Sequence, residues 1–314
     1  MSTAQDPSPD QRKPFHLRLP ATSANLGPGF DALGLAMALY LTIDAAPAEA
    51  FHIDATGRNP DLCAKIKDNL ILTTYMDVLA NAGILAGHLH LKLHNEIPLG
   101  MGCGSSASAL LAGIMLANHF GNLNWTSQQI LEEACRREGH PDNVAACLLG
   151  GMTASAVTKD GVVTATLGQN LPWRLALALP SASLSTKKAR ALLPSHYSRE
   201  DAVANVQSTA LLVAAFAQGR GDLLRTAMQD RIHQPYRQKA CPLLPLLLPL
   251  AGNSGILGVA LSGAGPSVLL ITEDPSPVDL EDAIRQAAKE PILEVLQTTI
   301  SGGAISANQT VSAR

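Results

Sequence analysis

The chain has 314 residues, which is long for one average domain and suggests two at about 150 residues each. Hydrophobic residues make up 46% of it and aromatic residues only 4%, so an aliphatic core can stabilise the fold without metal or disulfide bonds. The formal net charge of −3 argues against nucleic acid or an anionic membrane as a general partner, although a local pocket can still bind an anionic substrate.

The five cysteines have no CxxC or zinc-type spacing, and their odd number favours reduced thiols over a disulfide framework. The most apolar stretch, residues 241–251, contains three prolines and is much shorter than the roughly 20 residues of a membrane-spanning helix. Residues 1–14 are polar and proline-containing. We therefore predict a cytoplasmic protein without a membrane partner and with a flexible tail over residues 1–14.

In the first half, apolar segments 16–19 and 33–43 flank a turn-rich segment, residues 20–31. Alternating apolar residues predict strands over 51–55 and 89–93. Helical spacing predicts helices over 69–82, 105–118 and 127–137, the last capped by Thr126 or Ser127. Residues 151–166 then have the pattern of a hairpin.

The pattern restarts at Trp173 with a strand to Leu179, and we predict helices over 185–193, 199–218 and 221–229. Apolar strand-like segments at 258–261 and 267–272 precede a final helix over 278–288. We place the domain boundary at residue 168, between domains of residues 15–168 and 169–314. Strands and helices without regular βαβ alternation predict the α+β class.

A glycine-rich loop lies between the strand ending near residue 93 and the helix starting at 105. It reads Pro98-Leu99-Gly100-Met101-Gly102-Cys103-Gly104-Ser105-Ser106. Glycines let backbone N–H groups face a phosphate closely, and a helix N-terminus adds free donors and partial positive charge. From these residues alone, a phosphate-binding loop and a tight packing turn both remain open.

Two familiar nucleotide-binding loops can be excluded by spacing. The P-loop of nucleoside triphosphatases ends in Gly-Lys-Ser/Thr, whereas Ser105 follows Gly104 directly here. The dinucleotide-binding fingerprint needs glycine or alanine at the position of Ser105, and an acidic residue about 20 positions later. Residues 119–125 contain no acidic residue, so an NAD-type oxidoreductase is not supported.

Residues 98–107 resemble the Pro-x-Gly-x-Gly-x-Gly-Ser-Ser-Ala signature of the GHMP kinases, which include galactokinase, homoserine kinase, mevalonate kinase and phosphomevalonate kinase. Three other segments resemble the homoserine kinase family in particular: Ser23-Ala24-Asn25-Leu26-Gly27-Pro28-Gly29-Phe30-Asp31, Glu138-Gly139-His140-Pro141-Asp142-Asn143-Val144-Ala145 and Leu261-Ser262-Gly263-Ala264-Gly265-Pro266-Ser267. Shorter matches lie at 185–190 and 234–237, so the resemblance extends over nearly the whole chain from residue 15.

This resemblance implies a two-domain fold: an N-terminal ribosomal-protein-S5-like domain that binds ATP, and a C-terminal ferredoxin-like α/β sandwich that completes the substrate site. It implies ATP-dependent phosphorylation of the hydroxyl of L-homoserine, with Mg²⁺, for threonine biosynthesis. The alternatives are a related kinase for another small hydroxylated amino acid or acid, and a catalytically silent nucleotide-binding protein. Members of this family tend to dimerise, so the resemblance also allows a homodimer.

The resemblance further implies roles for single residues in substrate binding. Asn25 and Asp31 would bind the ammonium group, although both are also common turn residues. Arg190 and Arg237 would hold the carboxylate, to which a planar guanidinium can donate two hydrogen bonds. Thr186 and Gly263 would lie close to the substrate. Asn69 would contact adenine, or it would simply cap the helix that follows it.

Glu138 and Ser106 are the implied ligands of Mg²⁺, which prefers oxygen donors. A surface ion pair within Arg136-Arg137-Glu138 is the alternative for Glu138, and Glu132 and Glu133 are rival ligands. Asn143 and His140 resemble residues that approach the reacting hydroxyl. Since an amide cannot act as a general base near neutral pH, Asn143 would orient the hydroxyl, whose proton passes to the γ-phosphate or to water. We expect the side chain of Asp142 to point elsewhere, which makes it a weaker candidate for a base.

The chain departs from its relatives at two positions. They often have a lysine just before the phosphate loop, where this chain reads His94-Asn95-Glu96; Lys92, Lys187 or Lys188 could supply the charge instead. Cys103 replaces the usual leucine inside the loop, which predicts a change in packing and sensitivity to oxidation if the thiol is exposed.

Overall fold

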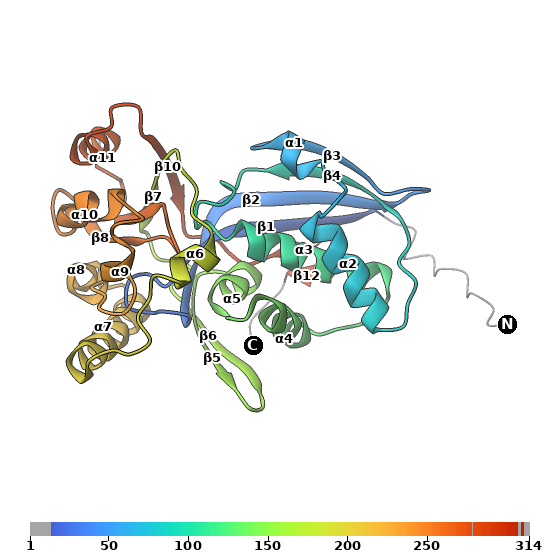
Figure 1. Cartoon of the computed structure of the whole chain (residues 1–314), viewed down its shortest axis with the longest axis horizontal. Helices are drawn as coiled ribbons and strands as arrows, with labels where there is room; N and C mark the ends of the chain where they lie inside the picture. The colour runs from blue at the N-terminus through green and yellow to red at the C-terminus, as the bar shows by residue number, and fades with distance from the viewer. Residues whose placement is uncertain (1–13, 278, 307–308, 311–314) are drawn as a thin grey trace.

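The computed structural model describes residues 14–277, 279–306 and 309–310, so the predicted tail, apart from Pro14, lies outside the described residues. The chain forms two halves, each built on one β-sheet (Figure 1). The half coloured blue to green holds the first sheet, and the yellow-to-red half holds the second. The α+β class predicted from the sequence is confirmed.

The first sheet has the strand order β12-β11-β1-β2-β4-β3, and β5 pairs with both β2 and β6. Its strands are β1 (Phe15–Ala24), β2 (Leu33–Pro47), β3 (His52–Gly57), β4 (Leu89–Asn95), β5 (Met152–Thr158), β6 (Gly161–Leu167), β11 (Ile305–Ser306) and β12 (Gln309–Thr310). Because β11 pairs with β1, residues from the end of the chain complete the N-terminal sheet. A single domain boundary after residue 168 would assign β11 to the second domain, although β11 pairs with β1 of the first sheet.

Five helices accompany this sheet: α1 (Pro60–Cys63), α2 (Leu70–Asn81), α3 (Ser105–Phe120), α4 (Ser127–Glu138) and α5 (Asp142–Leu149). In Figure 1, α2 to α5 lie in front of β1 and β2. Strand β4 alternates buried and more exposed residues, so its leucines join the core while His90, Lys92 and His94 face the other side. Thr126 caps α4 in a capping box with Gln129, as one of the two predicted caps.

The second sheet is antiparallel, with the order β10-β7-β9-β8. Its strands are β7 (Arg174–Leu179), β8 (Ile256–Leu261), β9 (Val268–Thr272) and β10 (Glu294–Thr299). Taken in chain order, the first strand lies between the fourth and the third, and helices separate the first two and the last two. This βαββαβ arrangement is that of the implied ferredoxin-like sandwich.

The helices of this half are α6 (Thr186–Arg190), α7 (Arg199–Gln218), α8 (Leu224–Ala227), α9 (Gln234–Arg237), α10 (Leu243–Leu247) and α11 (Leu280–Ala288), with 3₁₀ turns η2 (Gly221–Leu223) and η3 (Leu248–Leu250). The predicted helix over 199–218 is correct at both ends. Those over 185–193 and 221–229 were too long: the first is α6 alone, and the second is η2 followed by α8. No helix in the described part of the chain is long and apolar enough to span a membrane.

The prediction of a turn-rich segment over 20–31 was wrong in its first half. Residues 20–24 continue β1 and pair with residues 34–40 of β2 after a register shift between Pro20 and Ala21. Proline is tolerated there because the irregularity interrupts the regular ladder. The strand therefore carries Thr22, Ser23 and Ala24 into the interior, beside the glycine loop.

Helix α5 approaches β2 closely at Gly34. A Cβ at Gly34 would lie 2.1 Å from the carbonyl oxygen of Asp142, the first residue of α5. Only glycine can therefore occupy this position without a shift of α5.

We predict that Gly34→Ala lowers the free energy of unfolding by about 1–3 kcal/mol, because the added methyl group must push α5 off the sheet. Urea denaturation measures the loss. Gly87→Ala is the matched control, since a Cβ at Gly87 meets nothing within 4 Å. Equal stability of the two variants would contradict this account of the contact.

Candidate active site

The glycine loop, residues 98–106, connects β4 to the first turn of α3. Gly100, Gly102 and Gly104 all have left-handed backbone conformations, with φ between 70° and 76°. Residues with a side chain rarely adopt this backbone conformation, so glycine at every second position lets the loop curl at the N-terminus of α3. Ser105 and Ser106 begin α3, where backbone N–H groups are free to bind an anion.

The loop is held between the two halves of the chain. The backbone N–H of Thr22 donates to the carbonyl of Cys103 at 3.0 Å, and the hydroxyl of Ser262 donates to the carbonyl of Gly102 at 2.8 Å. A Cβ at Gly104 would lie 1.9 Å from Thr22 Oγ1, and one at Gly102 would lie 2.2 Å from the Ser262 carbonyl oxygen. The glycines thus permit close approach on both sides as well as the curl.

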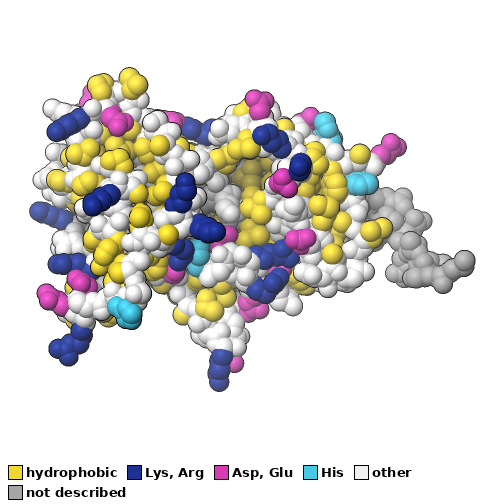
Figure 2. All heavy atoms as spheres, viewed as in Figure 1, with side chains coloured by type: hydrophobic (Ala, Val, Ile, Leu, Met, Phe, Trp, Pro, Cys, Tyr) yellow, Lys and Arg dark blue, Asp and Glu magenta, His cyan; other side chains and the backbone are white. Residues whose placement is uncertain are grey.

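A cavity of about 300 Å³ lies beside the loop, lined by Leu41, Leu62, Asn69, Leu93, Leu99, Ser105 and Ser106, among others. Figure 2 shows this face hollowed in its upper middle part, with hydrophobic side chains inside. The mainly apolar lining fits a flat heterocycle, and the polar loop lies at one end.

Asn69 caps α2: its Oδ1 accepts from the N–H groups of Ile71 and Leu72, and its Nδ2 donates to carbonyls of Cys63 and Lys65. Capping was one of its two interpretations from sequence; a contact with adenine stays a prediction.

Behind the loop, β1 and α5 bring the predicted catalytic residues together. Thr22 Oγ1 donates to Asn143 Oδ1 at 2.7 Å, and Asn143 Nδ2 donates one hydrogen bond to Asp142 Oδ1 at 3.4 Å, which leaves its second N–H for another acceptor. Asp142 Oδ1 accepts from the N–H of Asn143 at 2.7 Å and lies 2.6 Å from His140 Nδ1. The expectation that Asp142 points elsewhere was wrong, because the carboxylate of this first residue of α5 turns back toward His140 and the backbone N–H of Asn143.

Burial acts to lower the pKa of His140, but the hydrogen bond and charge of Asp142 outweigh it, so the pKa lies above the ordinary imidazole value. Burial raises the pKa of Glu138, and the charge of Asp142 raises it further. The ion pairs considered for Glu138 are made instead by Glu133, which contacts Arg136 and Arg137. Glu138 is left as a half-buried carboxylate that an added cation would stabilise.

Asp31, which was predicted to bind the ammonium group of the substrate, pairs with Arg190, which was predicted to bind its carboxylate. Arg190 donates two hydrogen bonds to Asp31, from Nη1 to Oδ2 at 3.0 Å and from Nη2 to Oδ1 at 2.6 Å. Carboxylate and guanidinium are both about one-third exposed, at 35% and 36%. Ligand atoms of Asp31, His140 and Asp142 lie within 4.8 Å of one another, which places this ion pair beside the Asn143 group.

Asn25 and Asp31 both have positive φ, at 70° and 56°. The Asn25 side chain supports this turn by donating from Nδ2 to the carbonyl of Gly263 at 2.9 Å and accepting from the N–H of Asp31 at 3.1 Å. Hydrogen bonds of Asn25 thus join three predicted substrate residues, two from this turn and Gly263 from the second half of the chain.

Arg237 lies beneath this group and is only 1% exposed. Its Nη1 lies 3.0 Å from His233 Nδ1, and its Nε donates to the carbonyl of Ala189 at 3.3 Å. Burial lowers the pKa of Arg237, and the nearby charge of Arg190 lowers it further. The centre of the Phe30 ring lies 5.4 Å from the guanidinium carbon of Arg190 and 5.6 Å from that of Arg237. Arg237 supports the pocket from inside in this conformation, and a direct contact with a substrate stays a prediction.

Some sequence candidates lie apart from this group. Thr186 is exposed at the start of α6, and Lys187 and Lys188 are exposed beside it. Lys92 faces away from the cavity, because it alternates with Leu93, which lines it. Cys103 is buried, and burial raises its pKa to about 12, so the condition for oxidation sensitivity is not met.

Comparisons with known proteins support the resemblance seen in the sequence. Residues 69–151 match the family model of the GHMP kinases N terminal domain, and residues 212–291 match that of the GHMP kinases C terminal domain. A homoserine kinase from Solibacter usitatus is 50% identical over 260 residues, covering 82% of this chain and 85% of the relative.

The chain belongs to the homoserine kinase family of GHMP kinases. A homoserine kinase from Synechocystis sp. is 41% identical over 264 residues, which cover 83% of this chain and 86% of that relative. The crystal structure of homoserine kinase from Cytophaga hutchinsonii has 25% identity and a TM-score of 0.78, and covers 97% of this chain and 100% of that one. The similarity therefore includes both halves of this GHMP kinase.

Several residues of the site were missed or undervalued from sequence. Asp142 was considered only as a weak base, and the roles of His233 and Ser262 were not considered. His233 is buried and its Nε2 lies 2.7 Å from the carbonyl oxygen of Gly27. Its position just before the 234–237 match was the one available signal. Ser262 lay within a recognised motif, but its hydrogen bond to the phosphate loop depends on how the two halves pack.

We predict that His140 titrates above about pH 6.5, the ordinary imidazole value. In Asp142→Asn its pKa should fall, because burial still favours the neutral ring while the balancing negative charge is lost. NMR titration of the imidazole nitrogens measures both values, and Asp44→Asn, which alters a carboxylate paired with His16, is the control. An unchanged His140 pKa in Asp142→Asn would contradict the assigned contact.

Proposed function

We propose that the protein transfers the γ-phosphate of ATP to the hydroxyl of L-homoserine, giving O-phospho-L-homoserine and ADP for threonine biosynthesis. The observation that carries the choice of substrate is the bidentate pair of Asp31 and Arg190 beside Asn143. Homoserine carries one ammonium and one carboxylate on the same carbon. Binding can therefore exchange one internal ion pair for two external ones, with the substrate ammonium on Asp31 and its carboxylate on Arg190.

This exchange favours an amino acid over other hydroxylated molecules. A neutral sugar has no charge with which to open the pair. A hydroxy acid without an amino group would take Arg190 and leave the Asp31 carboxylate without its partner, which costs several kcal/mol when the group is desolvated. Both charges must therefore be present for the exchange to be favourable.

The substrate hydroxyl is oriented by Asn143, whose amide is itself held by Thr22. Asp142 is committed to His140 and to the start of α5, so the hydroxyl proton passes to an oxygen of the transferring phosphate or to water. Phosphoryl transfer tolerates the lack of a strong base, because positioning and charge neutralisation supply most of the catalysis. His140, whose pKa is raised by the hydrogen bond and charge of Asp142, would balance the charge of this buried carboxylate when it is protonated.

Glu138 and Ser106 would hold Mg²⁺. A carboxylate and a hydroxyl are the oxygen donors that this ion prefers, and burial raises the pKa of Glu138, so a bound cation would stabilise its ionised form. When bound, Mg²⁺ neutralises charge on the phosphates of ATP. The phosphates would lie on loop 98–106, with adenine in the apolar cavity near Asn69. A cytoplasmic location and a homodimer fit this proposal as further expectations.

The first test is an ADP-release assay with matched acceptors. L-Homoserine should be the best, and 4-hydroxybutyrate and 3-amino-1-propanol, which lack its amino and carboxylate groups respectively, should each react at least about 100-fold less efficiently, as expected for loss of a charge-assisted pair. L-Serine, L-threonine, mevalonate and galactose complete the panel. Faster turnover of another amino acid or acid would favour the related-kinase alternative, and no turnover of any acceptor would contradict the kinase assignment.

Two substitutions should separate binding from chemistry. Asp31→Asn should raise KM for homoserine by about 10- to 100-fold, because it removes a charged acceptor. Asn143→Ala should lower kcat by about 100-fold with a smaller change in KM, because it removes orientation of the reacting hydroxyl. Steady-state kinetics at saturating ATP measure both effects. Small and equal effects of the two variants would show that the pocket is misplaced.

A further inference from the structure

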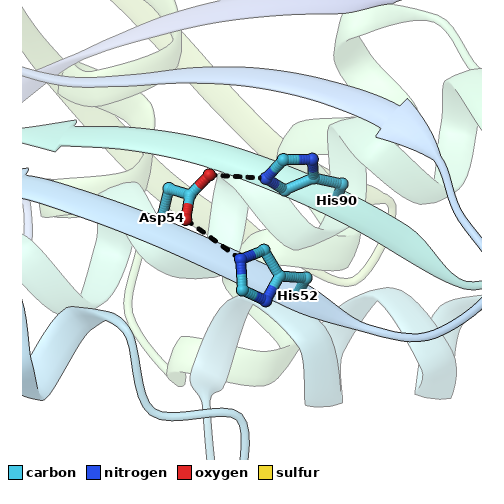
Figure 3. Close-up of side chains that lie close together, drawn as sticks. All are labelled: His52, Asp54 and His90. Carbon is cyan, nitrogen blue, oxygen red and sulfur yellow. Dashed lines mark hydrogen bonds and ion pairs between the residues drawn. The ribbon is translucent and has the colours of Figure 1, made fainter.

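A second group of polar side chains lies on the exposed face of β3 and β4, whereas Asp31 lies in the turn before β2 and Asn143 lies on α5. Strands β3 and β4 are parallel, and His52 is directly paired with His90. Asp54 is two residues beyond His52, and therefore projects from the same face of β3. Figure 3 shows the three side chains turned toward one another, with both imidazole rings facing the carboxylate of Asp54.

The contacts in this group converge on one carboxylate. His52 Nε2 lies 3.0 Å from Asp54 Oδ1, and His90 Nε2 lies 2.8 Å from Asp54 Oδ2. Both rings therefore present the same nitrogen to the same side chain, and the ligand atoms, one from each residue, lie within 4.8 Å of one another. Hydrogen bonds from His90 and His52 lower the pKa of Asp54, which keeps the carboxylate ionised.

We propose that His52, Asp54 and His90 bind one divalent transition-metal ion of the zinc class on the outer face of β3 and β4. Two imidazole nitrogens and one carboxylate oxygen are three ligands of the type that Zn²⁺, Co²⁺ and Ni²⁺ accept, whereas Mg²⁺ prefers oxygen alone. In a tetrahedral site, neighbouring ligand atoms lie about 3.3 Å apart, given metal–ligand bonds of about 2.0–2.1 Å. The two observed histidine–carboxylate separations, 3.0 Å to one oxygen of Asp54 and 2.8 Å to the other, differ from this value by a few tenths of an ångström.

The site is accessible and partly preformed. The side chains of His52 and Asp54 are 63% and 57% exposed, so water can complete the coordination and the ion needs no entry path. The rings are held 4.9 Å apart by the sheet itself, because their backbones are hydrogen-bonded neighbours. Backbone pairing between the strands therefore reduces the ordering that binding would otherwise require.

One charge opposes cation binding. Lys92 is paired with Asp54 in the register of β3 and β4, and it projects from the same exposed face between His90 and His94. A like charge at this distance weakens binding without blocking the ligands. Lys92 therefore provides a test of the proposed site. If a cation binds here, removing the positive charge of Lys92 should increase the affinity for the metal.

The experiment is a calorimetric and spectroscopic titration of untagged, chelator-treated full-length protein with Co²⁺. One equivalent should bind to the wild type, and the affinity should fall at least about tenfold in His90→Gln and in Asp54→Asn. His94→Gln is the matched control, because its ring lies on the same face of β4 and bonds to Thr56 outside the cluster. Lys92→Gln should bind more tightly than the wild type.

The absorption spectrum identifies the ligands. Bands of four-coordinate Co²⁺ without a thiolate charge-transfer band would exclude the cysteines, of which Cys63 is the most accessible. The same affinity in His90→Gln as in the wild type would overturn the proposal and place the ion elsewhere, such as among Asp31, His140 and Asp142. Failure of the wild type to bind Co²⁺ would also overturn it. Neither result would depend on kinase activity.

Discussion

The site depends on a close contact between the glycine loop and both halves of the chain. Gly102 lies against the backbone of Ser262 from the second half, and Gly104 lies against Thr22 from β1. Each contact leaves no room for a Cβ, so the loop geometry and the packing of the halves are linked. The hydrogen bond from Ser262 to Gly102 and that from Asn25 to Gly263 join the glycine loop to the residues proposed to bind the amino acid, so all of them lie around one junction.

At this junction, two pairs of charged residues differ in how far they are exposed to solvent. The Asp31–Arg190 pair is partly exposed and open to exchange with a zwitterion, whereas the His140–Asp142 pair is more deeply buried and holds Asn143. The first would account for the choice of substrate and the second for positioning during transfer. Glu138 beside them lacks a comparable partner, which is consistent with a role for a cation in completing the site.

Motifs with fixed spacing predicted the family, and they named most of the residues that the structure brings together at the candidate site. Periodicity also predicted most strands and the long helix α7. The continuation of β1 through Pro20 was missed, because glycine and proline indicate a turn locally while pairing with β2 overrides that preference. The return of β11 to the first sheet and the contact of Ser262 with the loop depend on long-range packing, which periodicity does not report.

The most direct test of substrate exchange at the domain junction is a crystal structure with L-homoserine and a non-hydrolysable ATP analogue. The account predicts that the two hydrogen bonds between Asp31 and Arg190 are opened, with the substrate ammonium on Asp31 and its carboxylate on Arg190. The substrate hydroxyl should lie between Asn143 and the terminal phosphate on the glycine loop. An intact Asp31–Arg190 pair, with homoserine bound elsewhere, would contradict the account.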